Sequence, residues 1–227
     1  MAVEEPDSGV TGDLSIIVPC FNERPTIEVI LRRLRDTLPD AEIVVVDDGS
    51  TDGSREIATS LAEALRLRLI CLETRGGKGA AVRAGVNAAG GEWIVIQDAD
   101  LEYDPADLPG MLDAARLRSP CAVYGSRYLG RAAAPPRLWL NYIGVRLLAI
   151  LEYVLYGIWL SDPHTCYKML PASMIRQLNL RSNGFELCAE INSKGCNLYC
   201  ALPRLAYTAH SDTYVSLMMF NKWGSRI

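Results

Sequence analysis

The sequence predicts an α/β fold in which helices flank a mainly parallel sheet. Three observations predict it: short apolar runs recur along the chain, segments of helical periodicity separate them, and a polar or glycine-rich cluster follows each run. Continuous apolar runs are typical of strands buried on both faces, as the strands of parallel sheets are. Strands that alternate with helices build such a sheet.

The apolar runs give the expected strands in chain order. They are Leu14–Val18, Ile43–Val46, Leu69–Leu72, Trp93–Ile96 and Cys121–Tyr124. The clusters after them read PCFNE, DDGSTDGS, ETRGGKG, QDADLEYDP and GSRY. Because ligands of open parallel sheets bind outside the carboxyl ends of the strands, we expect these clusters to converge on one crevice.

Helical segments are expected between these strands. The first, Pro25–Leu38, begins with Pro-Thr and places apolar side chains on one face. The same periodicity predicts helices over Ser54–Leu67 and Lys78–Ala89.

A longer apolar segment, Leu138–Leu160, has the length of a membrane span. Arg146 and Glu152 lie near its middle, and both are costly in hydrocarbon, so a simple span is disfavoured. At about 100° per residue the polar and apolar side chains separate onto two arcs, which predicts an amphipathic helix. Its apolar face would either pack on the core or lie in a membrane interface, where Trp and Tyr are typical.

Length and composition favour one domain and exclude several functions. With 227 residues and 49% hydrophobic content, residues 14–227 suffice for a single domain, after a polar lead-in over 1–13 that we expect to be disordered. The net charge of -4 argues against nucleic acid as a partner. Seven scattered cysteines without a CxxC pair indicate reduced thiols in the cytoplasm, and two histidines leave little room for a zinc cluster.

The cluster QDADLEYDP carries acids at every second position, namely Asp98, Asp100, Glu102 and Asp104. If the chain stayed extended, they would share one face and repel one another. Either the strand ends near Gln97 and the acids spread into water on a turn, or they bind a divalent cation. Hard ions such as Mg²⁺ or Mn²⁺ prefer carboxylate oxygens and leave positions open for phosphate, so we favour the cation.

The glycine-rich segments indicate a ligand site less strongly than the acidic cluster does. GGKGAAVRAG lacks the spacing of a P-loop, so its glycines are expected to form a tight turn, with Lys78 facing substrate phosphates. In DDGSTDGS an aspartate either fastens the turn or, as we prefer for Asp48, accepts hydrogen bonds from a base or ribose.

Further polar groups follow the long apolar segment. Asp162, His164 and Lys168 lie in a proline-containing loop from which they could reach the crevice. Glu186 and Glu190 are four residues apart on an expected helix, where solvation is the default.

In this order, PCFNE, VVVDDGSTDGS, GKGAAVRAG, QDADLEYDP, GSRY and the DP-x-x-x-Y-K stretch resemble the family 2 inverting glycosyltransferases. More narrowly, they resemble the dolichol-phosphate mannose synthase-like enzymes, which move a sugar from a nucleotide diphosphate to a polyprenyl phosphate. The match covers roughly Leu14 to Leu170. It implies a GT-A fold with a Rossmann-like sheet, and it makes Leu138–Leu160 the helix that brings the enzyme to its lipid at the cytoplasmic face of a membrane.

The resemblance also implies roles for individual residues. The nucleotide sugar, GDP-mannose or a UDP-sugar, would contact residues at four of the strand ends, namely Pro19, Phe21, Glu23, Val46, Asp48, Lys78, Asp98 and Ala99. Asp98 and Asp100 would bind Mg²⁺ or Mn²⁺, and Glu102 would complete the metal's shell. Phe21 stands where the family usually has Tyr, and Cys166 where it has Gly.

Transfer to a phosphate acceptor needs no strong base, and Arg127, Arg131 and Lys168 would then position that acceptor. Asp100, Arg127 and Asp162 are the expected catalytic residues. A hydroxyl acceptor would need a base, for which Asp162, Glu186 and His210 are candidates.

Alternatives to a lipid acceptor stay open. His210 stands where the family carries an arginine that grips the acceptor phosphate, and a histidine cannot form a bidentate fork. The alternatives are a glycosyltransferase with a non-lipid acceptor and a non-catalytic subunit that binds a sugar nucleotide. Sugar nucleotidyltransferases are disfavoured, because PCFNE does not resemble their glycine-rich N-terminal pattern.

Overall fold

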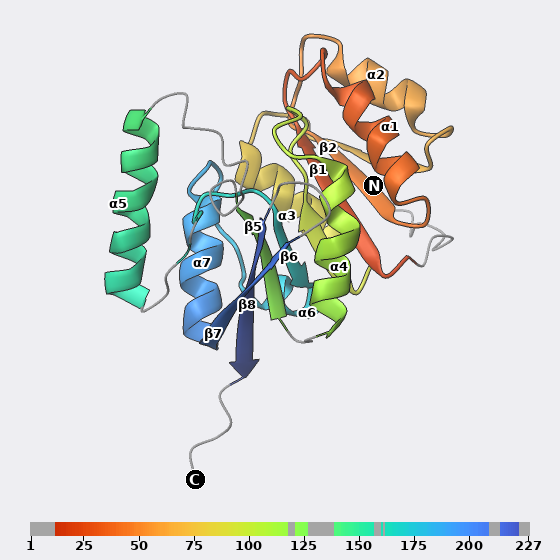
Figure 1. Ribbon diagram of the computed structural model, residues 1–227. Helices are drawn as coiled ribbons and strands as arrows, with labels where there is room; N and C mark the ends of the chain where they lie inside the picture. Colours follow the sequence, from red (N-terminus) through yellow and green to blue (C-terminus); the bar gives the residue numbers. More distant parts are fainter. Residues whose placement is uncertain are drawn as a thin grey trace.

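A computed structural model describes residues 12–117, 121–126, 139–156, 160, 162–208 and 214–222. These residues form one eight-stranded sheet in the order β3-β2-β1-β4-β6-β5-β8-β7, with helices packed against it (Figure 1). The strands are β1 Leu14–Cys20, β2 Glu42–Asp47, β3 Leu67–Cys71, β4 Trp93–Ile96, β5 Cys121–Ser126, β6 Lys168–Pro171, β7 Tyr199–Thr208 and β8 Tyr214–Lys222. Most of the lead-in over 1–13 lies outside the described residues.

The sheet has a parallel half and an antiparallel half. β3, β2, β1 and β4 run parallel, as expected from their continuous apolar sequences. From β6 onward every pairing is antiparallel. The expectation that Cys121–Tyr124 is a parallel strand is therefore wrong: a strand can be buried on both faces in either orientation, and β5 pairs antiparallel with β6 and β8.

The helices are α1 Ile27–Thr37, α2 Ser54–Leu61, α3 Lys78–Ala88, α4 Leu108–Leu117, α5 Trp139–Tyr156, α6 Ala172–Gln177 and α7 Leu187–Leu198, and a 3-10 turn covers Pro105–Asp107. The helix expected over Ser54–Leu67 is too long. It ends at Leu61, the chain turns with Arg66 at φ 47°, and Leu67 already belongs to β3.

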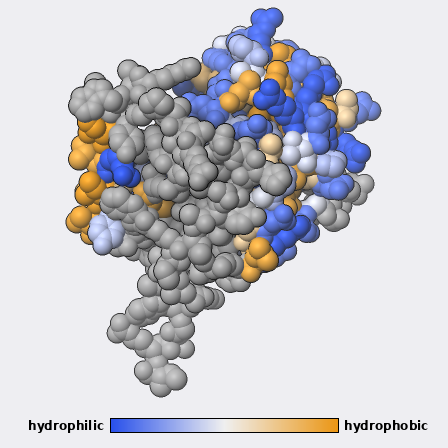
Figure 2. Space-filling view, viewed as in Figure 1, coloured by the Kyte–Doolittle hydropathy of each residue, from blue (hydrophilic) through white to orange (hydrophobic). Residues whose placement is uncertain are grey.

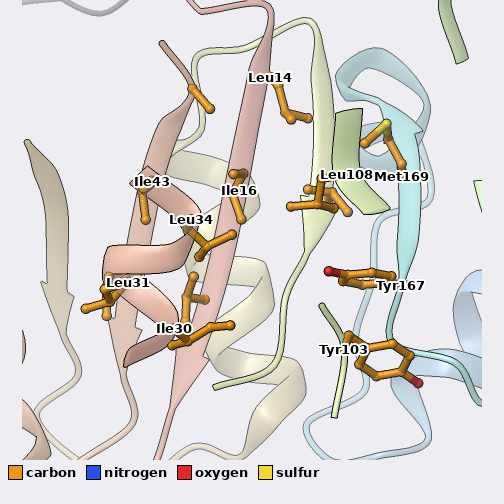
Figure 3. Close-up of a cluster of buried hydrophobic side chains, with 14 of the residues drawn as sticks. Leu14, Ile16, Ile30, Leu31, Leu34, Ile43, Tyr103, Leu108, Tyr167 and Met169 are labelled. Carbon is orange, nitrogen blue, oxygen red and sulfur yellow. The ribbon is translucent and has the colours of Figure 1, made fainter. Parts of the chain in front are cut away.

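Two apolar clusters cover the two faces of the sheet. The first joins α1, α2 and α4 to side chains such as Ile16 and Val45, and Figure 3 shows its centre, with Ile30 and Leu34 of α1 against Ile16. The second joins α3, α6 and α7 to the next residues along the same strands, Ile17 and Val46. Because alternate strand residues enter opposite clusters, the sheet lies buried between two helical layers.

Helix α5 stands at the edge of the molecule, beside α7 (Figure 1). Its apolar side chains point outward: Leu147 is 61% and Val154 73% exposed, and an apolar patch covers that side in Figure 2. Ala149 and Glu152 are buried instead. Packing of the apolar arc on the core, one of the two expected arrangements, is thus wrong for the described residues. No helix among these residues is long and apolar enough to cross a membrane.

Candidate active site at the carboxyl ends of the parallel strands

A cavity of about 460 Å³ opens where the order of the parallel strands reverses, between β1 and β4. This is the place at which open α/β sheets bind ligands. Many of the residues predicted for the site line it: Pro19, Phe21, Glu23, Asp48, Lys78, Asp98, Ala99, Asp100 and Glu102. The strand ends therefore converge as expected, while the individual roles stay predictions.

The segment after β1 is fixed to the segment after β2. Asn22, at φ 57°, donates its N–H to Ser50 Oγ (2.9 Å) and accepts from the N–H of Thr51 (2.9 Å). The N–H of Glu23 bonds Ser54 Oγ (2.8 Å). These bonds hold the neighbouring Phe21 ring at the cavity wall, where the Arg75 guanidinium lies 4.0 Å from the ring centroid.

Asp47, the last residue of β2, and Asp48, which follows it, both hold neighbouring segments in place. Asp47 is buried and accepts from Arg55 Nε at 2.7 Å. Asp48 accepts the N–H of Gly76 (2.7 Å) and of Gly77 (2.8 Å), one on each carboxylate oxygen. Asp48 thus holds the GGK turn in place and also lines the cavity, and each of its carboxylate oxygens can accept one more hydrogen bond.

The GGK turn is clamped from the other side by residues 181–183. The N–H of Gly79 donates to Asn183 O at 2.7 Å, and a Cβ on Gly79 would overlap the carbonyl of Ser182. Arg83 of α3 donates to the same carbonyl. Glu190 of α7 in turn accepts the N–H of Ser182 (2.8 Å). These contacts fix the position from which Lys78 enters the cavity.

The acidic segment after β4 is not extended. The strand ends at Ile96, and Leu101 at φ 64° reverses the chain. The Tyr167 hydroxyl donates to Gln97 Oε1 (2.6 Å), which ties this turn to the segment before β6. Asp104 leaves the group of acids and caps the turn at Pro105, where it accepts from the N–H of Ala106. Of the four acids that alternate in the sequence, Asp98, Asp100 and Glu102 therefore line the cavity, whereas Asp104 caps the turn at Pro105.

The ammonium group of Lys78 lies next to the first of these acids, Asp98. Its Nζ lies 2.6 Å from Asp98 Oδ1 and donates to Cys166 Sγ at 2.9 Å. Burial opposes the charge of Lys78, but Asp98 and Cys166 outweigh it and raise the pKa of the ammonium above its usual range. Burial and the nearby charges of Asp100 and Asp98 raise the pKa of Glu23. A negative field thus fills this end of the cavity.

A divalent cation fits this field as the partner of two carboxylates. Asp98 and Asp100 are one residue apart on the turn, and both line the cavity. No three acid, cysteine or histidine side chains of the described residues form a ready-made metal cage, so Glu102 is not gathered with the pair. Mg²⁺ in phosphate-transfer sites commonly has one or two carboxylates and takes its other ligands from phosphate and water.

Two cysteines lie near the loop before β6. Cys166 lines the cavity, and Cys188, in the first turn of α7, places its Sγ 3.8 Å from the carbonyl oxygen of Thr165. The neighbouring Cys166 thiol lowers the pKa of Cys188; burial opposes this shift, while the charges of Lys168 and Lys78 support it.

Other predicted site residues lie away from the cavity. Val46 is fully buried in the core, and Lys168, 1% exposed, donates to Thr165 O (2.5 Å) and Pro163 O (3.1 Å) below the cavity. Asp162 is also buried and does not line it. Lys168 thus braces the loop instead of reaching into the site. Arg127, Arg131 and His210 lie outside the described residues.

The structure adds residues that were not predicted for the site. They are Cys20, Arg75, Gly77, Ala81, Tyr103, Cys166 and Phe185, whereas His164, which also lines the cavity, lies in the loop expected to reach it. Cys166 could have been found from its place in the DP-x-x-x-Y-K stretch. Phe185, 78% exposed at the cavity, carries no sequence signal that distinguishes it from a core aromatic.

Comparison with known proteins shows to which family the chain belongs. The family described as Glycosyl transferase family 2 matches residues 15–178. A dolichol-phosphate mannosyltransferase from Pyrococcus furiosus is 30% identical over 80% of this chain and 53% of its own. A polyprenol monophosphomannose synthase from Mycolicibacterium smegmatis is 28% identical over 88% of this chain and 72% of its own. The chain spans about half the length of the Pyrococcus protein.

Solved structures support the architecture. Glucosyl-3-phosphoglycerate synthase from Mycobacterium tuberculosis, in complex with Mn²⁺, UDP and glucosyl-3-phosphoglycerate, superposes with a TM-score of 0.60 at 22% identity. The superposition covers 84% of this chain and 65% of that one. The likeness concerns the fold, and the expected GT-A architecture is confirmed.

Proposed function

The chain belongs to glycosyl transferase family 2, and we propose that it transfers a hexose of mannose or glucose type from a nucleoside diphosphate to a polyprenyl or dolichyl phosphate. The observation that carries this proposal is one cavity at the strand switch point that holds an aspartate pair and Lys78. The lipid phosphates in the names of the Pyrococcus and Mycolicibacterium relatives support the acceptor.

The nucleotide binds along the ends of β1 and β2. Phe21 and Pro19 give this wall an apolar surface for a base, and Arg75, stacked on Phe21, can donate to base carbonyls. Asp48 fixes the GGK turn and keeps acceptor capacity toward the cavity. Guanine and uracil both offer carbonyl acceptors here, so GDP- and UDP-sugars are the two candidate donors.

The diphosphate binds between Lys78 and the aspartate pair. A Mg²⁺ or Mn²⁺ ion held by Asp98 and Asp100 would neutralise the diphosphate that leaves. Lys78 carries its charge in the same space and can bind a phosphate oxygen. Both aspartates are held by the turn that Tyr167 fixes, so little rearrangement is needed at the moment of reaction.

An anionic acceptor agrees with the acids that the structure describes. A phosphate oxygen attacks the anomeric carbon from the face opposite the diphosphate, the bond to the diphosphate oxygen breaks, and its electron pair leaves with the diphosphate. No proton has to be removed from such an acceptor. Asp162 and Glu186, two candidates for a base toward a hydroxyl acceptor, do not line the cavity.

Helix α5 is the membrane contact in this proposal. Its outward apolar side chains, among them Leu147, Leu151 and Val154, would enter the interface while Glu152 stays bonded to Asn192 of α7. A lipid acceptor with a long hydrocarbon tail needs such a surface, because its phosphate never leaves the headgroup region.

Titration calorimetry with GDP- and UDP-sugars, each with Mn²⁺, Mg²⁺ or a chelator, tests the donor site. We expect one class of sugar nucleotide to bind with a divalent cation and to bind much more weakly with the chelator. If the sugar nucleotide binds with the same affinity in the chelator as in the divalent cation, in both the wild type and Asp98→Asn, the proposed metal dependence is wrong.

A further inference from the structure

Phe185 is a large apolar side chain that stays exposed at the cavity. It lines the cavity, is 78% exposed, and lies two residues before α7. The chain has only three phenylalanines, and a second one, Phe21, lines the same cavity. Single exposed apolar residues are ordinary on a protein surface, so exposure alone assigns no role to Phe185. Its backbone support and its neighbours distinguish it from such residues.

The backbone around Phe185 is held from two directions. Glu186 Oε1 accepts the N–H of Gly184 at 2.9 Å and the N–H of Asn183 at 3.2 Å. From the other direction, the carbonyl oxygen of Asn183 accepts the N–H of Gly79 at 2.7 Å. A phenylalanine side chain has few rotatable bonds, so its ring on a fixed backbone loses little conformational entropy when a ligand covers it.

The ring of Phe185 lies beside the space proposed for the diphosphate. Lys78 Nζ is 5.5 Å from the centroid of the ring and 2.6 Å from Asp98 Oδ1. In the proposed function Lys78 binds a phosphate oxygen and Asp98 holds the cation, while the base contacts Phe21 at the other wall. The group attached to the diphosphate on the side away from the base is the sugar. The sugar is therefore the part of the donor that we expect at Phe185.

We propose that Phe185 is a sugar-binding residue of the donor site and that one face of the hexose ring packs on its aromatic ring. This inference rests on the proposed function. A pyranose ring carries C–H groups on its faces and hydroxyl groups around its edge. The face of an aromatic ring is partly negative, so it attracts the slightly positive C–H groups. The hydroxyl groups at the edge remain available to polar side chains of the cavity.

Titration calorimetry of Phe185→Ala with Mn²⁺ tests this contact, using GDP against GDP-mannose and UDP against UDP-glucose. For the pair that the wild type binds, we expect the affinity for the sugar nucleotide to fall about fivefold, as for the loss of one aromatic contact, and the affinity for the free nucleoside diphosphate to change less than about twofold. Phe185→Tyr keeps the aromatic face and should bind both ligands as the wild type does. Leu117→Ala, at an equally exposed position on α4, is the control and should change neither affinity.

Two results with Phe185→Ala would overturn the proposal. If the nucleoside diphosphate and the sugar nucleotide weaken equally, Phe185 contacts the base or the phosphates instead of the sugar. If neither affinity changes, Phe185 makes no contact with the donor, and a raised KM for polyprenyl phosphate in the same variant would assign it to the acceptor. A wild type that binds neither the nucleoside diphosphates nor the sugar nucleotides would instead refute the proposed function.

Discussion

Lys78 shows how much of the site depends on single contacts. It lies at the start of α3, pairs with Asp98 at 2.6 Å and donates to Cys166 at 2.9 Å. The sequence could predict that this lysine faces the crevice, because it follows a glycine turn at a strand end. It could not predict the partners, since Asp98 and Cys166 reach it from other segments of the chain.

Asp100→Asn should lower turnover about a hundredfold or more while the free energy of unfolding stays nearly the same. Asp100 is exposed, and it accepts a local hydrogen bond from the N–H of Glu102. The assay is initial-rate release of nucleoside diphosphate, paired with thermal unfolding.

Asp104→Asn is the matched control for that change. Asp104 belongs to the same run of acids but caps the turn at Pro105, a role that Asn fills equally well. It should keep turnover within about twofold of wild type. Equal losses in the two variants would mean that the run acts only through its overall charge.

Glu190→Gln should destabilise the protein by about 2 kcal/mol at neutral pH. Burial alone would raise the pKa of Glu190, but bonds from Lys194 and from the N–H groups of Ser182 and Arg181 lower it to about 2. The folded pKa is below the unfolded one, so this stability is present above about pH 4.5 and is lost as the pH falls toward about 2.

Urea unfolding between about pH 3 and pH 7 checks this dependence. The difference between wild type and Glu190→Gln should shrink as the pH falls. Glu28→Gln, which breaks an exposed pair with Arg32, is the control and should change stability by less than about 0.5 kcal/mol at any pH. A constant difference for Glu190→Gln across this range would contradict the assigned pKa.

At the scale of elements, the parallel strands and the helices between them follow directly from the sequence. β4 begins and ends at the residues expected, because a short apolar run bounded by glycine and acids leaves little choice. α2 ends six residues early, because Leu65 and Leu67 continue the helical spacing although the chain has already turned at Arg66. Periodicity cannot distinguish a buried turn from one more helical turn.

Gly79→Ala should destabilise the protein by roughly 1–3 kcal/mol and weaken sugar-nucleotide binding. A methyl group there would meet the carbonyl of Ser182 and push α3 away from residues 182–183, which moves Lys78. Gly144→Ala, on α5, meets nothing within 4 Å and should be neutral or slightly stabilising. Thermal unfolding and calorimetry of the two variants separate close packing from a general effect of glycine replacement.

At the scale of the whole molecule, the sequence predicted the parallel half, which carries most of the cavity, better than the antiparallel half that follows. The antiparallel strands β6, β7 and β8 were not expected, because a run as short as Lys168–Pro171 has no periodicity to recognise. The outward apolar face of α5 was one of two alternatives in the sequence. The choice depends on Glu152, which packs inward against Asn192 of α7, a contact between distant segments.

Replacing Leu147 and Val154 together by Ser should reduce binding to phospholipid vesicles about a hundredfold or more, because about 1.5–3 kcal/mol of transfer free energy is lost per large side chain that is fully buried. Both are exposed on α5, so folding should change little. Leu117→Ser, at an equally exposed position on α4, is the control and should bind vesicles as the wild type does. Co-sedimentation measures all three, and equal loss in Leu117→Ser would contradict a role for α5 in particular.

The most direct measurement is mass spectrometry of a polyprenyl phosphate after incubation with the protein, Mn²⁺ and GDP- or UDP-hexose. We expect that the lipid gains the mass of one hexose, that equimolar nucleoside diphosphate appears, and that Asp100→Asn abolishes both. Nucleoside diphosphate that appears without lipid product, or a sugar nucleotide that binds and stays intact with every lipid phosphate offered, would contradict this expectation.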